Sequence, residues 1–227
     1  MNRRKFNSLI SKSLSRNPKT DRELCLYNPT DTLRALKTNK KIKNWHNYII
    51  NQYTPPKKRI LLFFPCAAYK PWTEGKTRSQ NYKMLYSLLR KKEIKNEIAL
   101  HTVSEPLALI GENDYETMPL YDNPGLFKWF TRKNGLKWDQ KAFEKSVEYL
   151  GKLLAKFLKK HQEKYEKVLA FVKPNSSHQL MMKFAKRFSN LDIQIAPKRS
   201  DYAKLRNNYV WLANENIRKL LINNLNI

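Results

Sequence analysis

The sequence predicts an α/β fold: a doubly wound, mostly parallel sheet with flanking helices, preceded by a basic helical N-terminal extension. From residue 60 onward, short runs of β-forming apolar residues alternate with segments whose apolar side chains recur at helical spacing. These runs are apolar throughout, as in parallel strands that helices cover on both faces. We therefore expect at least four buried strands.

The N-terminal extension, residues 1–59, carries 15 basic and 3 acidic side chains and ends at TPPKKR, where two prolines block a continuing helix. A short helix is predicted from Asp31 to Leu36. Four apolar residues of the next segment share one helical face, which is expected to pack on the main domain: Ile42, Trp45, Ile49 and Tyr53. Trp45 and Tyr48 either fill the core or stack on bases.

The main domain is predicted to span residues 60–227. Its strands are expected at residues 60–64, 96–103, 167–173 and 191–196, and its helices at residues 77–92, 143–161, 177–188 and 201–225. The last of these helices is expected to close the domain by packing on the sheet or on a partner subunit. The connection over residues 105–136 is too long for a simple loop, so it is predicted to be functional or to contain small elements.

Lysine and arginine number 45 against 19 acidic residues, a net charge of +26 that is typical of proteins that bind a polyanion. We expect a nucleic acid as partner. No run approaches the roughly 20 apolar residues that span a bilayer, so no membrane contact is expected. A cytoplasmic location is favoured, although the Arg-, Lys- and Ser-rich N-terminus also fits a mitochondrial presequence.

Cysteine usage excludes several kinds of site. Cys25 and Cys66 are far apart and lack CxxC spacing, so one chain cannot build a disulfide framework, a zinc ribbon or a three-cysteine iron-sulfur site. Neither a metal nor another cofactor is expected, and any radical step would need another protein.

Cys66 directly follows the first predicted strand, at the sheet edge where open α/β folds bind their ligands. Lys70, Lys76, Arg78 and the start of the next helix would stabilise its thiolate, which predicts a reactive cysteine. The alternative is a small core residue that happens to be cysteine, because no histidine base is evident in the neighbouring sequence.

The segment EGKTRS is not a phosphate-binding P-loop, since Lys70 stands where that motif requires its first glycine. The amides of the segment, together with Lys76, Thr77 and Arg78, are still suited to hold a tRNA phosphate. A solvated basic turn is an equally consistent interpretation.

Residues Pro65-Cys66, then Lys70-Pro71-Trp72, then Gly75 and Arg78 resemble the PC-x3-KPY-x2-S-x2-H signature of archaeosine synthase, an archaeal enzyme that modifies a 7-deazaguanine base in tRNA. Two downstream segments are similar to the strand, turn and YDxP segments of that family, and the resemblance covers about residues 60–188: HTVSEPLALI and YDNP. Trp72 stands for the tyrosine of the signature, Gly75 for its serine and Arg78 for its histidine.

The resemblance implies a tRNA that carries preQ0, a 7-deazaguanine with a nitrile, and an amidine-forming transfer of free lysine to that nitrile. Cys66 would form a thioimide that the lysine amine displaces. Lys70 would stabilise the thiolate or donate a proton, and Glu105 and Asp122 would hold the incoming ammonium group and take its proton. The remaining residues expected at the site would contact substrate: Pro65, Pro71, Trp72, Lys76, Thr77, Arg78, Tyr121 and His178.

Each of these assignments has a structural alternative. Glu105 either serves catalysis or caps a turn before Pro106, and Asp122 either serves catalysis or hydrogen-bonds its own loop. His178 follows a strand and either touches substrate or lies beside a serine that caps the next helix. His101, inside an apolar run, is predicted to be a core histidine.

Two further functions stay open at this stage. The departures at Gly75 and Arg78, which replace the serine and histidine of the signature, favour a non-catalytic RNA-binding subunit of a split archaeosine synthase. A basic surface alone does not separate RNA from DNA, so modification of 7-deazaguanine in DNA is a third candidate. Long members of the family carry transglycosylase-like and PUA domains, so the expected partners also include a transglycosylase-like or radical SAM protein.

Overall fold

The computed structural model describes residues 3–203 and 210–225 and contains, within them, a five-stranded mixed sheet. The strand order is β3-β2-β1-β4-β5, and every neighbouring pair is parallel except β2 and β3. The strands are β1 (Ile60–Pro65), β2 (Ile98–Ser104), β3 (Ala108–Gly111), β4 (Lys167–Phe171) and β5 (Gln194–Ala196). This arrangement confirms the predicted α/β class, whereas β3 was not predicted.

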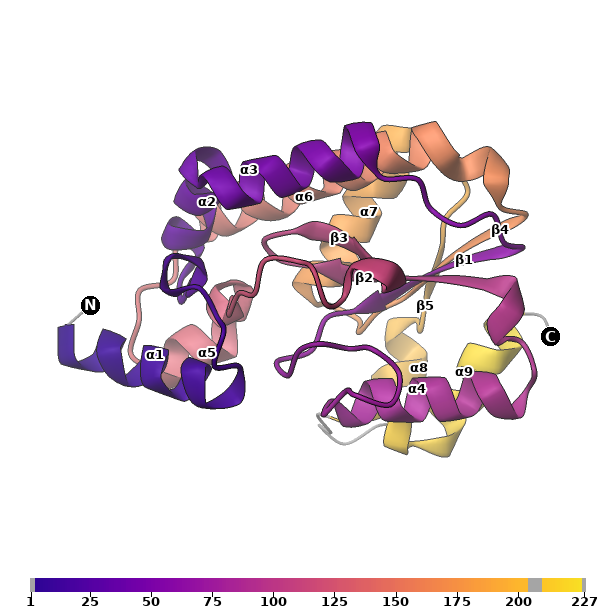
Figure 1. The fold of residues 1–227 in the computed structure, drawn as a ribbon, viewed down its shortest axis with the longest axis horizontal. Helices are drawn as coiled ribbons and strands as arrows, with labels where there is room; N and C mark the ends of the chain where they lie inside the picture. Colours follow the sequence, from indigo (N-terminus) through magenta and orange to yellow (C-terminus); the bar gives the residue numbers. More distant parts are fainter. Residues whose placement is uncertain (1–2, 204–209, 226–227) are drawn as a thin grey trace.

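Helices cover both faces of the sheet (Figure 1). The upper layer in that view consists of α2 (Pro29–Thr38), α3 (Lys40–Asn47), α6 (Gln140–His161) and α7 (Ser177–Ser189). The lower layer consists of α4 (Gln80–Lys91), α8 (Arg199–Ala203) and α9 (Glu215–Leu225). None of the helices in the described part of the chain combines the length and the apolar character that crossing a membrane requires.

The parallel strands change direction of winding between β1 and β4. After β1 the chain passes through α4 on one face to reach β2, and it later passes through α6 on the other face to reach β4, on the opposite side of β1 (Figure 1). A reversal of this kind leaves a crevice outside the carboxyl ends of the two strands, where ligands bind in open α/β sheets. Cys66 follows β1 and His178 follows β4 at this edge.

The N-terminal extension shares the hydrophobic core of the sheet. Ile42, Trp45 and Ile49 belong to the same buried cluster as the strands, and Trp45 Nε1 donates a hydrogen bond to the carbonyl of Leu109 over 3.0 Å. Trp45 therefore fills the core. The boundary at residue 59 stays a prediction, but the chain on its two sides forms one packed unit.

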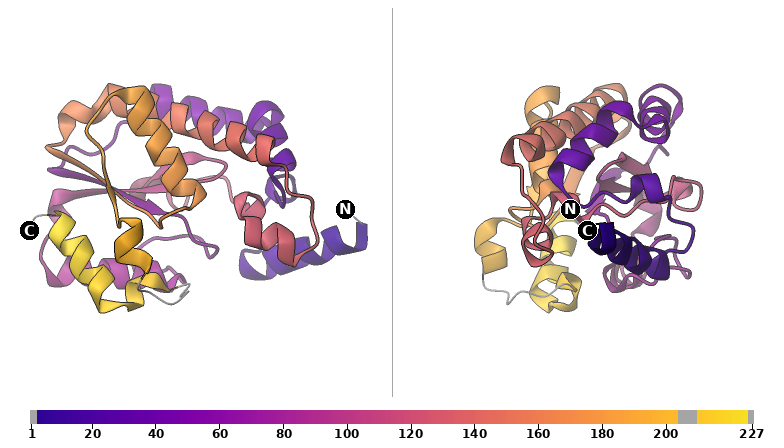
Figure 2. Two further views of the ribbon diagram at one scale, coloured as in Figure 1. Left: turned by 180° about the vertical axis from the view of Figure 1, so that it is seen from behind. Right: turned by 90° about the vertical axis from the view of Figure 1, so that its left-hand side faces the viewer.

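Two helices lie beyond the carboxyl edge of the sheet. α1 (Arg3–Arg16) runs beside the short α5 (Lys128–Lys133), as both views of Figure 2 show. A small apolar cluster joins them, in which the ring of Tyr27 contacts Phe6 and Phe130. The long connection predicted at residues 105–136 thus contains β3, α5 and short 3₁₀ turns.

The C-terminal segment is divided into two helices instead of the single one predicted. α8 ends at Ala203 and α9 begins at Glu215, while residues 204–209 lie outside the described residues. Ile217, Leu221 and Leu225 of α9 are buried against the domain. The closing role predicted for this segment is met by packing on the sheet.

We expect the fold to lose stability in mild acid because His101 is buried among aromatic rings. Burial lowers the pKa of His101 to about 4, and its Nε2 lies 2.9 Å from the hydroxyl of Tyr53. The unfolded chain takes up this proton below about pH 6.5 and the folded chain only near the lowered pKa. Stability is therefore complete above about pH 6.5 and falls by about 3 kcal/mol as the pH drops through this window.

Urea unfolding at pH 7 and pH 4.5 measures this loss. His101→Gln keeps a partner for Tyr53 without a titrating group, so its free energy of unfolding is expected to change less between the two pH values. His46 and His161, whose pKa values burial also lowers to about 4, supply remaining acid sensitivity of that variant. Equal losses in the two proteins would contradict the assignment.

Candidate active site

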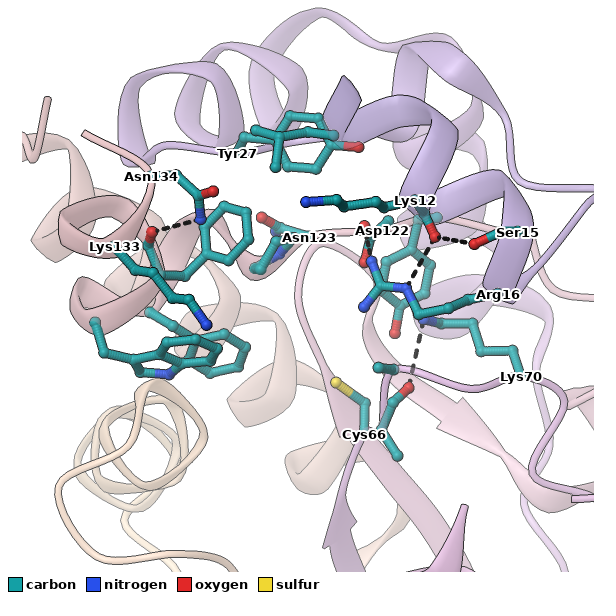
Figure 3. Close-up of a pocket in the computed structure, with 18 residues that line it drawn as sticks. Lys12, Ser15, Arg16, Tyr27, Cys66, Lys70, Asp122, Asn123, Lys133 and Asn134 are labelled. Carbon is teal, nitrogen blue, oxygen red and sulfur yellow. Dashed lines mark hydrogen bonds and ion pairs between the residues drawn. The ribbon is translucent and has the colours of Figure 1, made fainter. Parts of the chain in front are cut away.

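Cys66 lies at the wall of an open cavity of about 630 Å³ at the carboxyl edge of the sheet (Figure 3). Its backbone N–H donates to the carbonyl of Val103 over 3.0 Å, which extends the β1–β2 pairing by one residue and fixes the position of the thiol. The residue is half-buried, and its sulfur points toward the cavity. The volume falls within the range of about 300–1,000 Å³ usual for small-molecule sites.

Three parts of the chain form the cavity wall. The first is the loop after β1 and the second is the segment Tyr121–Pro124. The third is the pair of helices α1 and α5, together with the residue that follows α5. The predicted site residues in this wall are Cys66, Lys70, Tyr121 and Asp122. The extension therefore supplies one side of the site, which the sequence did not indicate.

Behind Cys66 stand two buried titratable side chains that approach its sulfur. His178 Nε2 lies 3.4 Å from Cys66 Sγ and 3.0 Å from Glu105 Oε2, and this carboxylate oxygen lies 3.9 Å from the sulfur. Glu105 follows β2 and His178 lies in the first turn of α7, so the adjacent strands β2, β1 and β4 bring the three residues together.

The geometry of this cluster differs from that of a catalytic triad, in which the nucleophile and the carboxylate contact different nitrogens of the histidine ring. The same ring nitrogen of His178 faces both the sulfur and the carboxylate, so its N–H is shared between Cys66 and Glu105. In this arrangement a protonated His178 stands directly beside the thiol, where its N–H can donate a proton.

The Glu105–His178 pair is ionised in the folded protein. Burial opposes charge on both groups, but the charge of His178 and the hydrogen bonds to the carboxylate together offset it and lower the pKa of Glu105. The pKa of His178 is likewise raised against the effect of burial by the Glu105 carboxylate and by Cys66. A buried carboxylate and a buried imidazolium thus stabilise each other beside the sulfur.

Lys70 is also buried at this site. Its Nζ lies 4.1 Å from the ring centre of Tyr121 and 3.5 Å from the carbonyl of Ala67, and burial lowers the pKa of Lys70. Asn17 of the extension holds the loop in place, because its Oδ1 accepts from the Lys70 N–H and its Nδ2 donates to the Ala68 carbonyl, each over 2.9 Å. The extension therefore positions the loop that carries the thiol.

Asp122 does not stand free to hold an ammonium group. Its carboxylate accepts a hydrogen bond from Arg16 Nη2 of α1 over 2.8 Å, and only 7% of its side chain is exposed. Its backbone pairs with the extension, since its N–H donates to the carbonyl of Leu24 and its carbonyl accepts from Leu26. Asp122 thus fixes α1 and the extension to the cavity wall.

Several residues expected to contact substrate lie away from the cavity. Trp72 is fully buried and stacks on Tyr82, so it has no surface to offer a substrate. Thr77 is buried, and its hydroxyl accepts from the Ser79 N–H just before α4. Both residues shape the loop. Pro65, which ends β1, and Pro71 do not line the cavity.

The basic segment before α4 is exposed and engaged elsewhere on the surface. Lys76 forms an ion pair with Glu116 over 2.8 Å. Arg78 donates to the carbonyl of Arg16 and lies over the ring of Tyr69 at 5.0 Å. Neither side chain stands beside Cys66, so the positive charge next to the sulfur comes from His178 and Lys70 instead.

Sequence reasoning placed His178 at the correct edge of the sheet but missed its contact with the thiol. The sequence signal for this contact is one of position. His178 lies in the first turn of a helix that follows one buried strand, and Cys66 follows another buried strand, so both lie at the same edge of the sheet. The three donor atoms Cys66 Sγ, Glu105 Oε2 and His178 Nε2 also lie within 4.8 Å of one another, so they could hold a metal ion such as Zn²⁺.

Comparison with known proteins gives one family and one relative. A protein-family profile described as "Domain of unknown function (DUF5591)" matches residues 42–206. Over 120 residues, the chain is 23% identical to archaeosine synthase subunit alpha of Thermococcus kodakarensis. The aligned part covers 51% of this chain and only 18% of that relative. No solved structure matches the chain.

Proposed function

Since the chain belongs to the DUF5591 family and is similar to part of an archaeosine synthase subunit, we propose that it acts in the archaeosine modification of tRNA. We propose that it forms an amidine from the nitrile of preQ0 held in tRNA. The observation that carries this proposal is the half-buried thiol of Cys66 at the wall of a cavity, in contact with a buried imidazolium–carboxylate pair.

The first step adds the thiol across the nitrile. Cys66 Sγ forms a bond to the nitrile carbon, one π bond of the C≡N group breaks, and the nitrogen takes up a proton, which gives a thioimide without loss of any atom. His178 is the proton donor in this step, because its shared N–H stands beside the reacting sulfur. The proton of the Cys66 thiol passes to the His178–Glu105 pair and replaces the proton that His178 has donated, so the step is balanced in protons.

The second step transfers the carbon to an amine. The side-chain amine of free lysine attacks the thioimide carbon, the C–S bond breaks, and Cys66 leaves as a thiolate that regains its proton. The product is an amidine. Glu105 is the buried base for the proton of the incoming amine, and Lys70, held near the sulfur with a lowered pKa, stabilises the departing thiolate. Asp122 serves the site through Arg16.

The charge of the chain supports a nucleic-acid substrate. The net charge of +26 suits phosphate backbones, and two basic helices that border the cavity, α1 and α5, place cations around its opening. A transglycosylase-like or radical SAM partner protein belongs to this proposal as the source of the preQ0-tRNA or the consumer of the amidine.

Mass spectrometry of nucleosides tests the function. The purified chain is incubated with preQ0-containing tRNA and with lysine carrying a heavy isotope, and the tRNA is then digested. We expect a new nucleoside whose mass equals preQ0 nucleoside plus lysine and carries the label. EDTA should leave its yield unchanged, because the thiol and not a metal ion activates the nitrile. A tRNA with guanine in place of preQ0 is the control, and an absence of the adduct in all samples would contradict the proposal.

A further inference from the structure

Asn123 is a buried amide in the cavity wall with an unused hydrogen-bond donor. The residue is 6% exposed and lies between α1 and α5 in the close-up (Figure 3). Its Nδ2 is buried and has no hydrogen-bond partner among the described residues. Buried polar atoms of native proteins are nearly always paired, so a free donor in a ligand-sized cavity points to a group that a ligand brings.

The orientation of this amide is fixed by its other end. Asn123 Oδ1 accepts from the hydroxyl of Thr32 over 3.0 Å and from the Gly125 N–H over 3.2 Å. The Gly125 N–H can only donate, so the atom that faces it must be the oxygen, and the NH₂ group must face the other way. Neither donor can move easily.

Gly125 packs so closely on the extension that a Cβ there would lie 2.6 Å from the backbone nitrogen of Asn28. Thr32, in α2, is fully buried. The donor is thus preorganised by two separate elements, which reduces the entropy that binding would cost.

Aromatic rings surround the donor. Tyr27, Phe127, Phe130 and the half-exposed Trp129 line the same cavity. Such rings favour flat heteroaromatic ligands, which stack on them with little regard to sequence, while a fixed donor adds selectivity for one edge of the ligand.

Two lysines border the opening from opposite walls. Lys12 of α1 and Lys133 of α5 are exposed, and Figure 3 shows both amines directed toward the open middle of the cavity. No acidic side chain of the described residues forms an ion pair with either amine. Cations so placed suit the phosphate of a nucleotide whose base enters between them.

We propose that Asn123 is the specificity-determining residue of this site: its Nδ2 donates a hydrogen bond to the 6-carbonyl of a guanine-type base that leaves its stack and enters the cavity. Lys12 and Lys133 hold the adjoining phosphate. The inference rests on the proposed function for the choice of base, since a nitrile at position 7 that meets Cys66 brings the 6-carbonyl, on the same base edge, to the same wall.

Binding of paired ligands to paired variants tests the proposal. The probes are the 5′-monophosphates of 7-cyano-7-deazaguanosine and of its 6-amino counterpart, in which a donor replaces the acceptor. Titrations use protein with Cys66→Ser, so that no chemistry intervenes. With Asn123 present, we expect the 6-oxo probe to bind about 10- to 100-fold more tightly than the 6-amino probe. Asn123→Asp should reverse this preference, because its carboxylate presents an acceptor.

Two further variants separate the parts of the site. Thr32→Val removes one hydrogen bond to the Asn123 amide, and valine has nearly the size of threonine. The preference for the 6-oxo probe should therefore fall at least about threefold, while thermal unfolding shows an intact fold. Lys133→Gln should weaken both probes equally and leave their ratio unchanged. The proposal is overturned if Asn123→Asp leaves the ratio of the affinities for the two probes unchanged. It is also overturned if the protein that retains Asn123 binds neither probe.

The test is independent of the catalytic proposal. A reversed preference together with failure to form the lysine adduct would reject the proposed function and retain the role of Asn123. If the parent protein forms the adduct but Asn123→Asp leaves the ratio of affinities unchanged, the proposed function is retained and the role of Asn123 is rejected.

Discussion

Replacement of Cys66 by serine is expected to lower the rate of amidine formation by about 10³-fold or more. The serine hydroxyl has nearly the same shape, but at neutral pH it is a far weaker nucleophile than a thiolate beside an imidazolium. The measurement is the initial rate of labelled lysine incorporation into preQ0-tRNA. The thermal unfolding midpoint should change little, because Cys66 is only half-buried and its backbone pairing with Val103 is kept.

The chain provides a matched control in its other cysteine. Cys25→Ser makes the same substitution outside the cavity lining, and its rate should stay within a few-fold of the parent. When lysine is omitted and the tRNA is afterwards digested with nuclease, the intact mass of the parent protein should rise by one preQ0 nucleotide, and Cys66→Ser should show no such rise. Turnover by Cys66→Ser at near the parental rate, or an adduct on Cys25, would eliminate the covalent step.

Glu105→Gln is expected to lower the same rate by about 10²- to 10⁴-fold at pH 8, the range over which positioned acid–base groups act. The change removes the carboxylate that holds His178 protonated, so the pKa of His178 falls toward its ordinary range or below it. His178 then stays protonated, as its role of proton donor requires, only at lower pH. The alkaline limb of the pH–rate profile should therefore move to lower pH, whereas a purely structural role would lower the rate at every pH alike.

Glu97→Gln is the control for this change. Glu97 forms an ion pair with Arg59 on the surface, and surface pairs contribute only about 0–1 kcal/mol, so its rate and pH profile should match those of the parent. His178→Asn should resemble Glu105→Gln in rate but should show no alkaline limb from a histidine. An unshifted limb in Glu105→Gln would contradict the assignment of His178 as the titrating group.

The sequence predicted the strands that are buried on both faces. β1, β2 and β4 are almost wholly buried and rich in apolar residues, whereas β5 has three residues, of which only Ile195 and Ala196 are apolar. β3 was not predicted because the strand, Ala108–Gly111, has only four residues, ends in glycine and follows a proline-containing turn. Among the described residues its strand partner is β2, to which it is antiparallel. Neither the periodicity nor the length of this segment distinguishes it from a loop.

The position of Cys66 at the carboxyl edge of the sheet could also be predicted, since its place after a buried strand follows from general rules of α/β sheets. Its contacts with Glu105 and His178 could not be, because they depend on the order β2-β1-β4, which no local pattern encodes. The positions of Asn17 and Asn123 left no signal at all. Their partners lie from about 50 to more than 90 residues away in the chain, across the packing of the extension on the loops.

The family profile begins at residue 42, yet Arg16 and Tyr27, which line the cavity, lie before it, as does Asn17, which holds the loop that carries Cys66. Cys66 and one wall of the cavity around it therefore belong to different stretches of the chain. Exchanging the first 41 residues between relatives would reshape that wall while leaving the sheet, Cys66 and Asn123 untouched.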